Sequence, residues 1–69
     1  MELREYDVVI SKRKLSENVP EGSLGTVLII HDPSVAYEVE FMEAGRSLDV
    51  LTVKDEDLIF VERYGPKTE

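Results

Sequence analysis

Glycine and proline divide this chain into short apolar runs. Each run has the length of a β-strand and is too short for most helices. In the clearest of them, residues 35–41, apolar side chains alternate with Glu38 and Glu40. This period of two is typical of a strand with one buried face. The sequence therefore predicts an all-β fold.

The order of these runs predicts an architecture. We expect strands at residues 6–10, 24–31, 35–41, 47–53 and 58–62. Between them we expect a long polar loop at 11–23, tight turns at 32–34 and 43–46, and one helical turn at 54–57. This combination predicts a small five-stranded SH3-like barrel. An OB-like barrel is the rival, but it normally places a helix between its third and fourth strands.

The chain has room for one small domain. Its 69 residues predict a single barrel over residues 1–63, followed by a polar tail at 64–69 that frays. Domains of this size often need a disulfide, a metal or a partner. The chain has no cysteine, so disulfides and thiolate metal sites are excluded.

The net charge narrows the range of partners. Fifteen acidic and eight basic residues give 8 − 15 = −7, a charge that repels phosphate backbones and attracts basic proteins. Nucleic acid is thus a poor default partner. No apolar run approaches the roughly 20 residues of a membrane span, and the N-terminus lacks the basic start of a signal peptide. We expect a cytoplasmic protein without membrane contact.

Several strands carry apolar residues on both faces. In residues 24–31, Leu24, Leu28 and Ile30 alternate with Val27 and Ile29, and the last two strands show the same mixture. Two interpretations follow. Strongly bent strands bring both faces against the core, or one face forms an exterior patch for a protein partner or a homodimer.

No residue pattern indicates catalysis, a metal or a cofactor. His31 stands beside Asp32, but no motif supplies a serine for a nucleophilic triad, and we interpret it as a turn residue. Residues 55–57 (Asp-Glu-Asp) form at most a weak cation site and are better explained as the acidic start of a helical turn. We therefore predict no enzyme.

Residues 22–27 (Gly-Ser-Leu-Gly-Thr-Val) do not form a phosphate loop. They lack the Lys-Ser/Thr ending, and no helix follows them. We interpret them as a turn that leads into a strand, with Gly25 allowing a bulge or a close crossing over the first strand. Gly25→Val is expected to destabilise the fold by on the order of 1–3 kcal/mol through strain.

Two charged groups are candidate partner-binding residues. Glu38 and Glu40 on the outward face of the third strand, together with Glu43 at its turn, predict a carboxylate stripe for a basic partner. The basic triplet in the first loop predicts a possible anion contact; it consists of Lys12, Arg13 and Lys14. A solvated surface is the alternative for both groups.

Four segments follow one another in a specific order: residues 7–9 (Asp-Val-Val), 19–27 (Val-Pro-Glu-Gly-Ser-Leu-Gly-Thr-Val), 36–41 (Ala-Tyr-Glu-Val-Glu-Phe) and 51–53 (Leu-Thr-Val). Over roughly residues 5–61 this order resembles a bacterial family of small domains of unknown function, common in cyanobacteria. The resemblance implies an SH3-like barrel, no assigned catalytic residues, and a gene-neighbour role beside small toxins.

The function predicted from these observations is a non-catalytic protein-binding module. Its specific form is an antitoxin, immunity or accessory partner of a basic toxin or nuclease. The alternative is a nucleic-acid- or ribosome-associated module, because the Gly-x-x-Gly-Thr-Val pattern is similar to KOW-type modules; those are usually basic, unlike this chain. A structural homo-oligomer is a further alternative.

Overall fold

A computed structural model describes residues 1–63. Five antiparallel strands form one sheet: β1 (Asp7–Ser11), β2 (Leu24–Asp32), β3 (Ala36–Glu43), β4 (Arg46–Lys54) and β5 (Leu58–Arg63). A 3₁₀ turn, η1 (Asp55–Asp57), precedes β5. The predictions of an all-β fold, a long first loop and one helical turn before the last strand are confirmed. The tail expected to fray lies outside the described residues.

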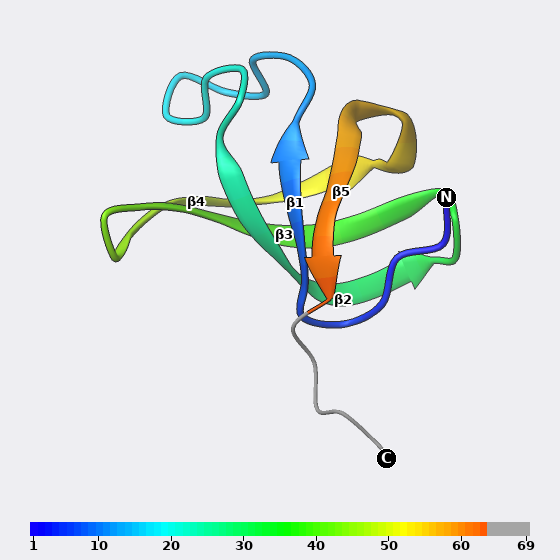
Figure 1. The fold of residues 1–69 in the computed structure, drawn as a ribbon. Helices are drawn as coiled ribbons and strands as arrows, with labels where there is room; N and C mark the ends of the chain where they lie inside the picture. The colour runs from blue at the N-terminus through cyan, green and yellow to red at the C-terminus, as the bar shows by residue number, and fades with distance from the viewer. Residues whose placement is uncertain (64–69) are drawn as a thin grey trace.

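The sheet is curled but is not a closed barrel. Its strand order is β4-β3-β2-β1-β5, so β4 and β5 are the two edges and no pairing joins them within residues 1–63. The β3–β4 hairpin crosses behind β1 and β5 (Figure 1). β5 pairs with β1, and the Lys12 backbone N–H donates to the Asp57 carbonyl of η1 at 2.8 Å just before β5 begins.

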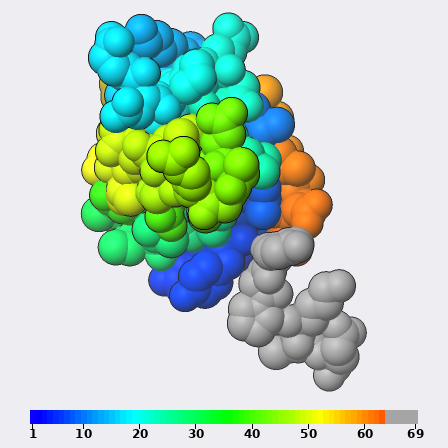
Figure 2. All heavy atoms as spheres, turned by 90° about the vertical axis from the view of Figure 1, so that its left-hand side faces the viewer, coloured from blue at the N-terminus to red at the C-terminus, as the bar shows by residue number. Residues whose placement is uncertain are grey.

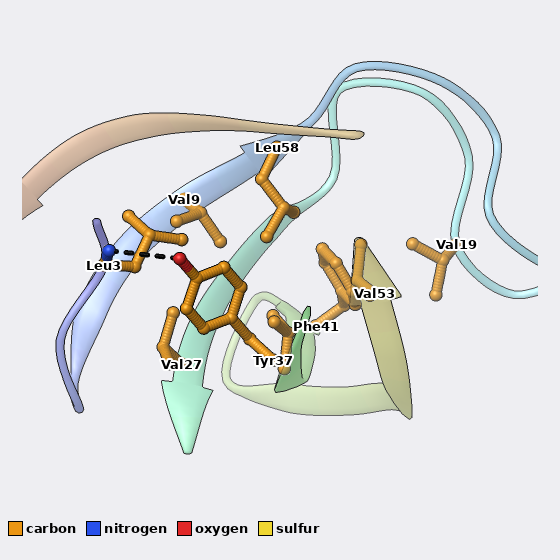
Figure 3. Close-up of a cluster of buried hydrophobic side chains, with 9 residues drawn as sticks. Leu3, Val9, Val19, Val27, Tyr37, Phe41, Val53 and Leu58 are labelled. Carbon is orange, nitrogen blue, oxygen red and sulfur yellow. Dashed lines mark hydrogen bonds between the residues drawn. The ribbon is translucent and has the colours of Figure 1, made fainter. Parts of the chain in front are cut away.

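The core fills the inner side of this curl. Val9, Val27, Phe41 and Leu58 are fully or almost fully buried there (Figure 3). Val39 is fully buried as well. In β3, Tyr37, Val39 and Phe41 face inward, as their alternation predicts, whereas Val35, expected on the same face, lies before the strand and is exposed. No helix in the described part of the chain is long and apolar enough to cross a membrane.

Two core residues come from outside the strands. Leu3 in the N-terminal segment and Val19 in the first loop are both buried. The loop folds back on itself, since the Leu15 N–H donates to the Val19 carbonyl at 2.9 Å and Ser16 forms a bridge with Val19. The loop thus fixes an apolar side chain in the core, which offsets the entropy of ordering it.

Tyr37 holds three segments together at one end of the core. Its hydroxyl accepts the N–H of Leu3 at 3.3 Å and that of Ser34 at 3.0 Å, and it lies 3.1 Å from Asp55 Oδ1 and from the Met1 carbonyl. Burial, together with the neighbouring Asp55 carboxylate, raises the pKa of this hydroxyl. The N-terminal segment, the β2–β3 turn and η1 therefore share one buried hydroxyl.

Bulges in β2 change which side chains face the core. The pairing with β3 shifts between Val27 and Ile29, so Val27 is buried whereas Ile29 is half exposed. Ile30 then packs against the core. The expectation that Leu24 and Ile30 share a face is therefore wrong, because a bulge inserts a residue and reverses the alternation beyond it.

Gly25 of β2 lies close to two side chains of β3. A Cβ at this position would come within 2.8 Å of both Phe41 Cδ1 and Val39 Cγ1. The expected close approach thus exists, but it is made by the side chains of β3 rather than by a crossing of the first strand. In the next hairpin, Gly45 has the expected positive φ, and Ala44 has one too, as a two-residue turn requires.

Candidate functional site

The outer face of the sheet carries an apolar row that spans four strands. In register, Met42 of β3 lies opposite Leu24 of β2, Leu24 opposite Ile10 of β1, and Ile10 opposite Ile59 of β5. Leu24 is 50% exposed, Ile59 47% and Met42 37%. These residues do not meet the core. Part of the apolar surface of the two-faced strands therefore lies on the exterior, whereas Leu48 and Leu51 of β4 pack against the core.

Two adjoining hollows on this face form what we call the outer groove. The first, of about 340 Å³, is lined by side chains from β1, β2, β3 and β5: Val8, Leu24, Thr26, Met42, Val61 and Glu62. The second, of about 380 Å³, shares Leu24 and Met42 and extends to residues 20–23, Glu43, Ala44 and Leu48. In Figure 2 the β3–β4 hairpin stands forward, β5 lies to its right, and atoms of β1 and β2 lie between them.

Carboxylates surround the outer groove. Glu21, Glu43 and Glu62 line it, and Glu40 lies on the same face opposite Thr26. Within residues 1–63 none of these four forms an ion pair. Arg46 lies opposite Glu43 in the hairpin, but no salt bridge joins the two. Among the described residues, the groove therefore combines an apolar floor with carboxylates that no ion pair neutralises.

Of the three predicted acidic residues, Glu38 differs from the other two. Its Oε1 accepts the Thr52 hydroxyl at 2.9 Å and lies 2.9 Å from His31 Nε2. The hydrogen bond from His31, followed by that from Thr52, lowers the pKa of Glu38. Glu38 thus has partners within its own sheet, whereas Glu43 lines the groove and Glu40 lies next to it. His31, interpreted from sequence as a turn residue, lies within β2.

The basic triplet lies away from the outer groove. Arg13 donates to both carboxylate oxygens of Asp57, at 3.0 and 2.9 Å, and Lys14 lies 3.3 Å from a carboxylate oxygen of Glu17. The Arg13 hydrogen bond lowers the pKa of Asp57. Lys12 is exposed and contributes its backbone N–H to η1. The structure does not bring the triplet together with Glu38, Glu40 or Glu43.

The acidic turn η1 is engaged within the chain. Asp55 Oδ2 lies 3.1 Å from the N-terminal amine of Met1, and Asp57 pairs with Arg13. Its three residues lie in the 3₁₀ turn that their sequence predicts. In the described part of the chain no three His, Asp or Glu side chains come together as metal ligands.

Asp7, the first residue of β1, is fully buried. Burial alone raises the pKa of its carboxyl, but hydrogen bonds from the Arg63 guanidinium, at 3.0 and 3.1 Å, and from the Arg4 N–H, at 2.8 Å, lower it below its ordinary value. This pair joins the end of β5 to the start of β1. Its position inside the structure indicates a stabilising role rather than a binding one.

The sequence did not single out Leu24, Met42, Val61, Glu21 and Glu62 as site residues. The signal that pointed toward them was the mixture of apolar residues on both faces of the strands. Only the register between strands distant in sequence shows which of these side chains lie together around one groove.

The family model "Domain of unknown function (DUF4926)" matches residues 5–60. The chain belongs to this family. The match covers β1 to β4, η1 and the first part of β5, and so includes most of the outer groove. No curated protein and no solved structure matches the chain.

Proposed function

We propose that this DUF4926 domain is a non-catalytic protein-binding module that binds a basic protein through the outer groove. The observation that carries the proposal is the exposed apolar floor bordered by carboxylates that form no ion pair among residues 1–63. Apolar side chains at the centre of an interface supply affinity, while charges at its rim speed encounter and select the partner.

The proposal extends to the class of partner. A basic toxin or nuclease, with this chain as its antitoxin, immunity or accessory protein in a bacterial cytoplasm, fits the net charge of −7 and the resemblance seen in the sequence. An SH3-like relationship is part of the same proposal and is supported by the antiparallel strand order and the 3₁₀ turn before β5.

Charge reversal on the groove tests the proposal. Glu40→Lys combined with Glu43→Lys changes the net charge by +4, and so does the control Glu2→Lys combined with Glu5→Lys in the exposed N-terminal segment. Proteins captured from the native cell by the tagged domain are quantified by mass spectrometry at about 0.1 and 0.5 M salt, between which exposed charge pairs are strongly screened.

We expect the wild type and the Glu2/Glu5 control to capture the same basic proteins. The Glu40/Glu43 variant should fail to capture them. High salt should reduce their capture. Equal capture by both double variants, or no effect of salt, would refute a role for the groove's carboxylates.

A nucleic-acid-binding module using Lys12, Arg13 and Lys14 remains the second candidate. Asp57 and Glu17 neutralise part of this triplet, so we rank it lower. RNA binding at about 0.15 M salt that is lost on replacing the triplet would reverse the ranking.

A homo-oligomer is the third candidate. It is favoured by the exposed apolar side chains along the edge strand β5: Ile59, Phe60 and Val61. A melting temperature that rises with protein concentration would support this candidate.

A further inference from the structure

We propose that the outer groove binds an amphipathic α-helix with an apolar stripe flanked by lysines or arginines, rather than an extended peptide. This inference rests on the proposed function and names the form of the partner segment. It follows from the exposed apolar side chains of the groove floor and from the backbone hydrogen bonds that its strands already make with one another.

The groove floor offers no free backbone groups in register with a ligand. Its residues Val8, Leu24 and Met42 belong to β1, β2 and β3, and each of these strands has a hydrogen-bonded neighbour on both sides. An extended segment laid over these strands would bury its own N–H and C=O groups without partners, at a cost of ~1–3 kcal/mol for each group left unsatisfied. A helix satisfies its backbone internally.

Extended segments have a different place to bind on this fold. Within residues 1–63, β4 and β5 are the edge strands of the sheet, and an extended segment adds to a sheet at such an edge. A strand there would lie beside the sheet and not over Leu24 and Met42. The location of the apolar side chains over the inner strands, and not along an edge alone, therefore selects a helix.

The charges fix the polar part of the partner. Glu43 and Glu21 stand at one end of the groove, and Glu62 stands at the β5 side, with Leu24 and Met42 between them. A helix whose apolar residues recur at i, i+3, i+4 and i+7 places one stripe on such a floor and basic residues on both flanks. The partner segment is thus a basic amphipathic helix.

Three leucine–lysine peptides of about 16 residues test this inference. All three have the same composition. In the first the leucines follow a helical period, in the second they alternate with lysine, and in the third they are distributed around the helix so that no apolar face forms. Binding to the ¹⁵N-labelled domain is followed by amide chemical shifts, and the fold of the peptide by circular dichroism.

We expect the helical peptide to bind at least ten-fold more tightly than the other two and to gain helicity on binding. Shifts should centre on Val8, Leu24, Thr26 and Met42. Leu24→Lys should weaken this binding at least ten-fold. Ile29→Lys is the matched control, because Ile29 has the same 50% exposure on the same strand but does not line the groove.

Met42→Lys provides a second groove variant, so that the test does not depend on one substitution, and thermal melts establish that each variant is folded. Equal binding by the third peptide would show attraction by charge alone and would refute the helix. Tighter binding by the alternating peptide, with shifts along β4 or β5, would refute it in favour of strand addition.

Failure of this inference is distinguishable from failure of the proposed function. If Leu24→Lys abolishes capture of the native partner while the alternating peptide is preferred, the groove is the site and the helix is wrong. If Leu24→Lys leaves native capture unchanged, the groove itself is not the binding site, and both proposals are wrong.

Discussion

Gly25→Ala tests how closely β3 packs on β2. The added Cβ would lie 2.8 Å from Phe41 Cδ1 and from Val39 Cγ1, whereas carbon atoms prefer about 3.5–4.0 Å. Phe41 and Val39 are fully buried and Gly25 is paired with Phe41, so these side chains, or the strand that carries them, must shift by up to about 1 Å within a close-packed core.

The expected cost follows from two opposing effects. Overpacking of a core costs about 1–3 kcal/mol, and replacing glycine by alanine regains about 0.4–1 kcal/mol by restricting the unfolded chain. We therefore expect Gly25→Ala to destabilise the fold by about 1–2 kcal/mol, and Gly25→Val to destabilise it more. With a urea slope of about 1 kcal/mol/M, alanine should lower the unfolding midpoint by about 1–2 M.

A double-variant cycle separates overpacking from strand propensity. Phe41→Leu shortens the side chain that the new Cβ would meet. In the double variant, the Gly25→Ala change should cost at least about 0.5 kcal/mol less than it does alone, because the contact with Phe41 is reduced while that with Val39 Cγ1 remains, and residues in contact couple by about 0.5–3 kcal/mol. An unchanged midpoint for Gly25→Ala, or strictly additive effects, would refute the packing argument.

Two further predictions concern buried polar groups. Arg63→Met should destabilise the fold by about 1.5–3 kcal/mol at neutral pH, because it removes charge-assisted hydrogen bonds to a buried carboxylate. In the wild type, folding lowers the pKa of Asp7. The contribution of Asp7 to the free energy of unfolding is therefore fully present above its unfolded pKa near 4, and it is lost as the pH falls through its pKa in the folded protein. Without Arg63, burial raises that pKa, so the stability difference between the two proteins, measured by urea unfolding, should shrink between about pH 7 and pH 3; a constant difference would contradict this. Tyr37→Phe should cost about 1–3 kcal/mol, because two backbone N–H groups lose their acceptor. The control Tyr6→Phe, at a half-exposed tyrosine, should change stability by less than about 0.5 kcal/mol. If Tyr37→Phe and Tyr6→Phe lowered the melting temperature equally, the role of the buried Tyr37 hydroxyl would be contradicted.

Local sequence patterns predicted the strands well. The alternation in residues 35–41 predicted which side chains of β3 are buried, and glycine or proline marked the turns at 32–34 and 43–46. These features depend on period and on backbone freedom, which are properties of neighbouring residues.

Core residues outside the strands were not predictable in this way. Leu3 and Val19 lie in segments without periodicity, and they are buried because the curled sheet leaves two ends that they cover. The reversal of faces within β2 arises from bulges, which no alternation pattern announces.

The candidate site was predicted in part. The carboxylates of β3 were identified from sequence, but the separation of Glu38 from Glu40 and Glu43 depends on cross-strand contacts with His31 and Thr52. The neutralisation of Arg13 by Asp57 joins residues 44 positions apart. Contacts of that kind follow from the fold and not from local sequence.

The sequence alone thus determined the all-β class, the number of strands and the acidic character of the chain, because strand length, alternation and charge are local or summed quantities. Tertiary structure decided that the sheet stays open, that Arg13 of the basic triplet pairs with Asp57, and that Val8, Leu24, Met42 and Val61 meet in one groove. The physical reason is register: hydrogen bonding between strands distant in sequence determines which side chains become neighbours, and the curl of the sheet determines which of them face water.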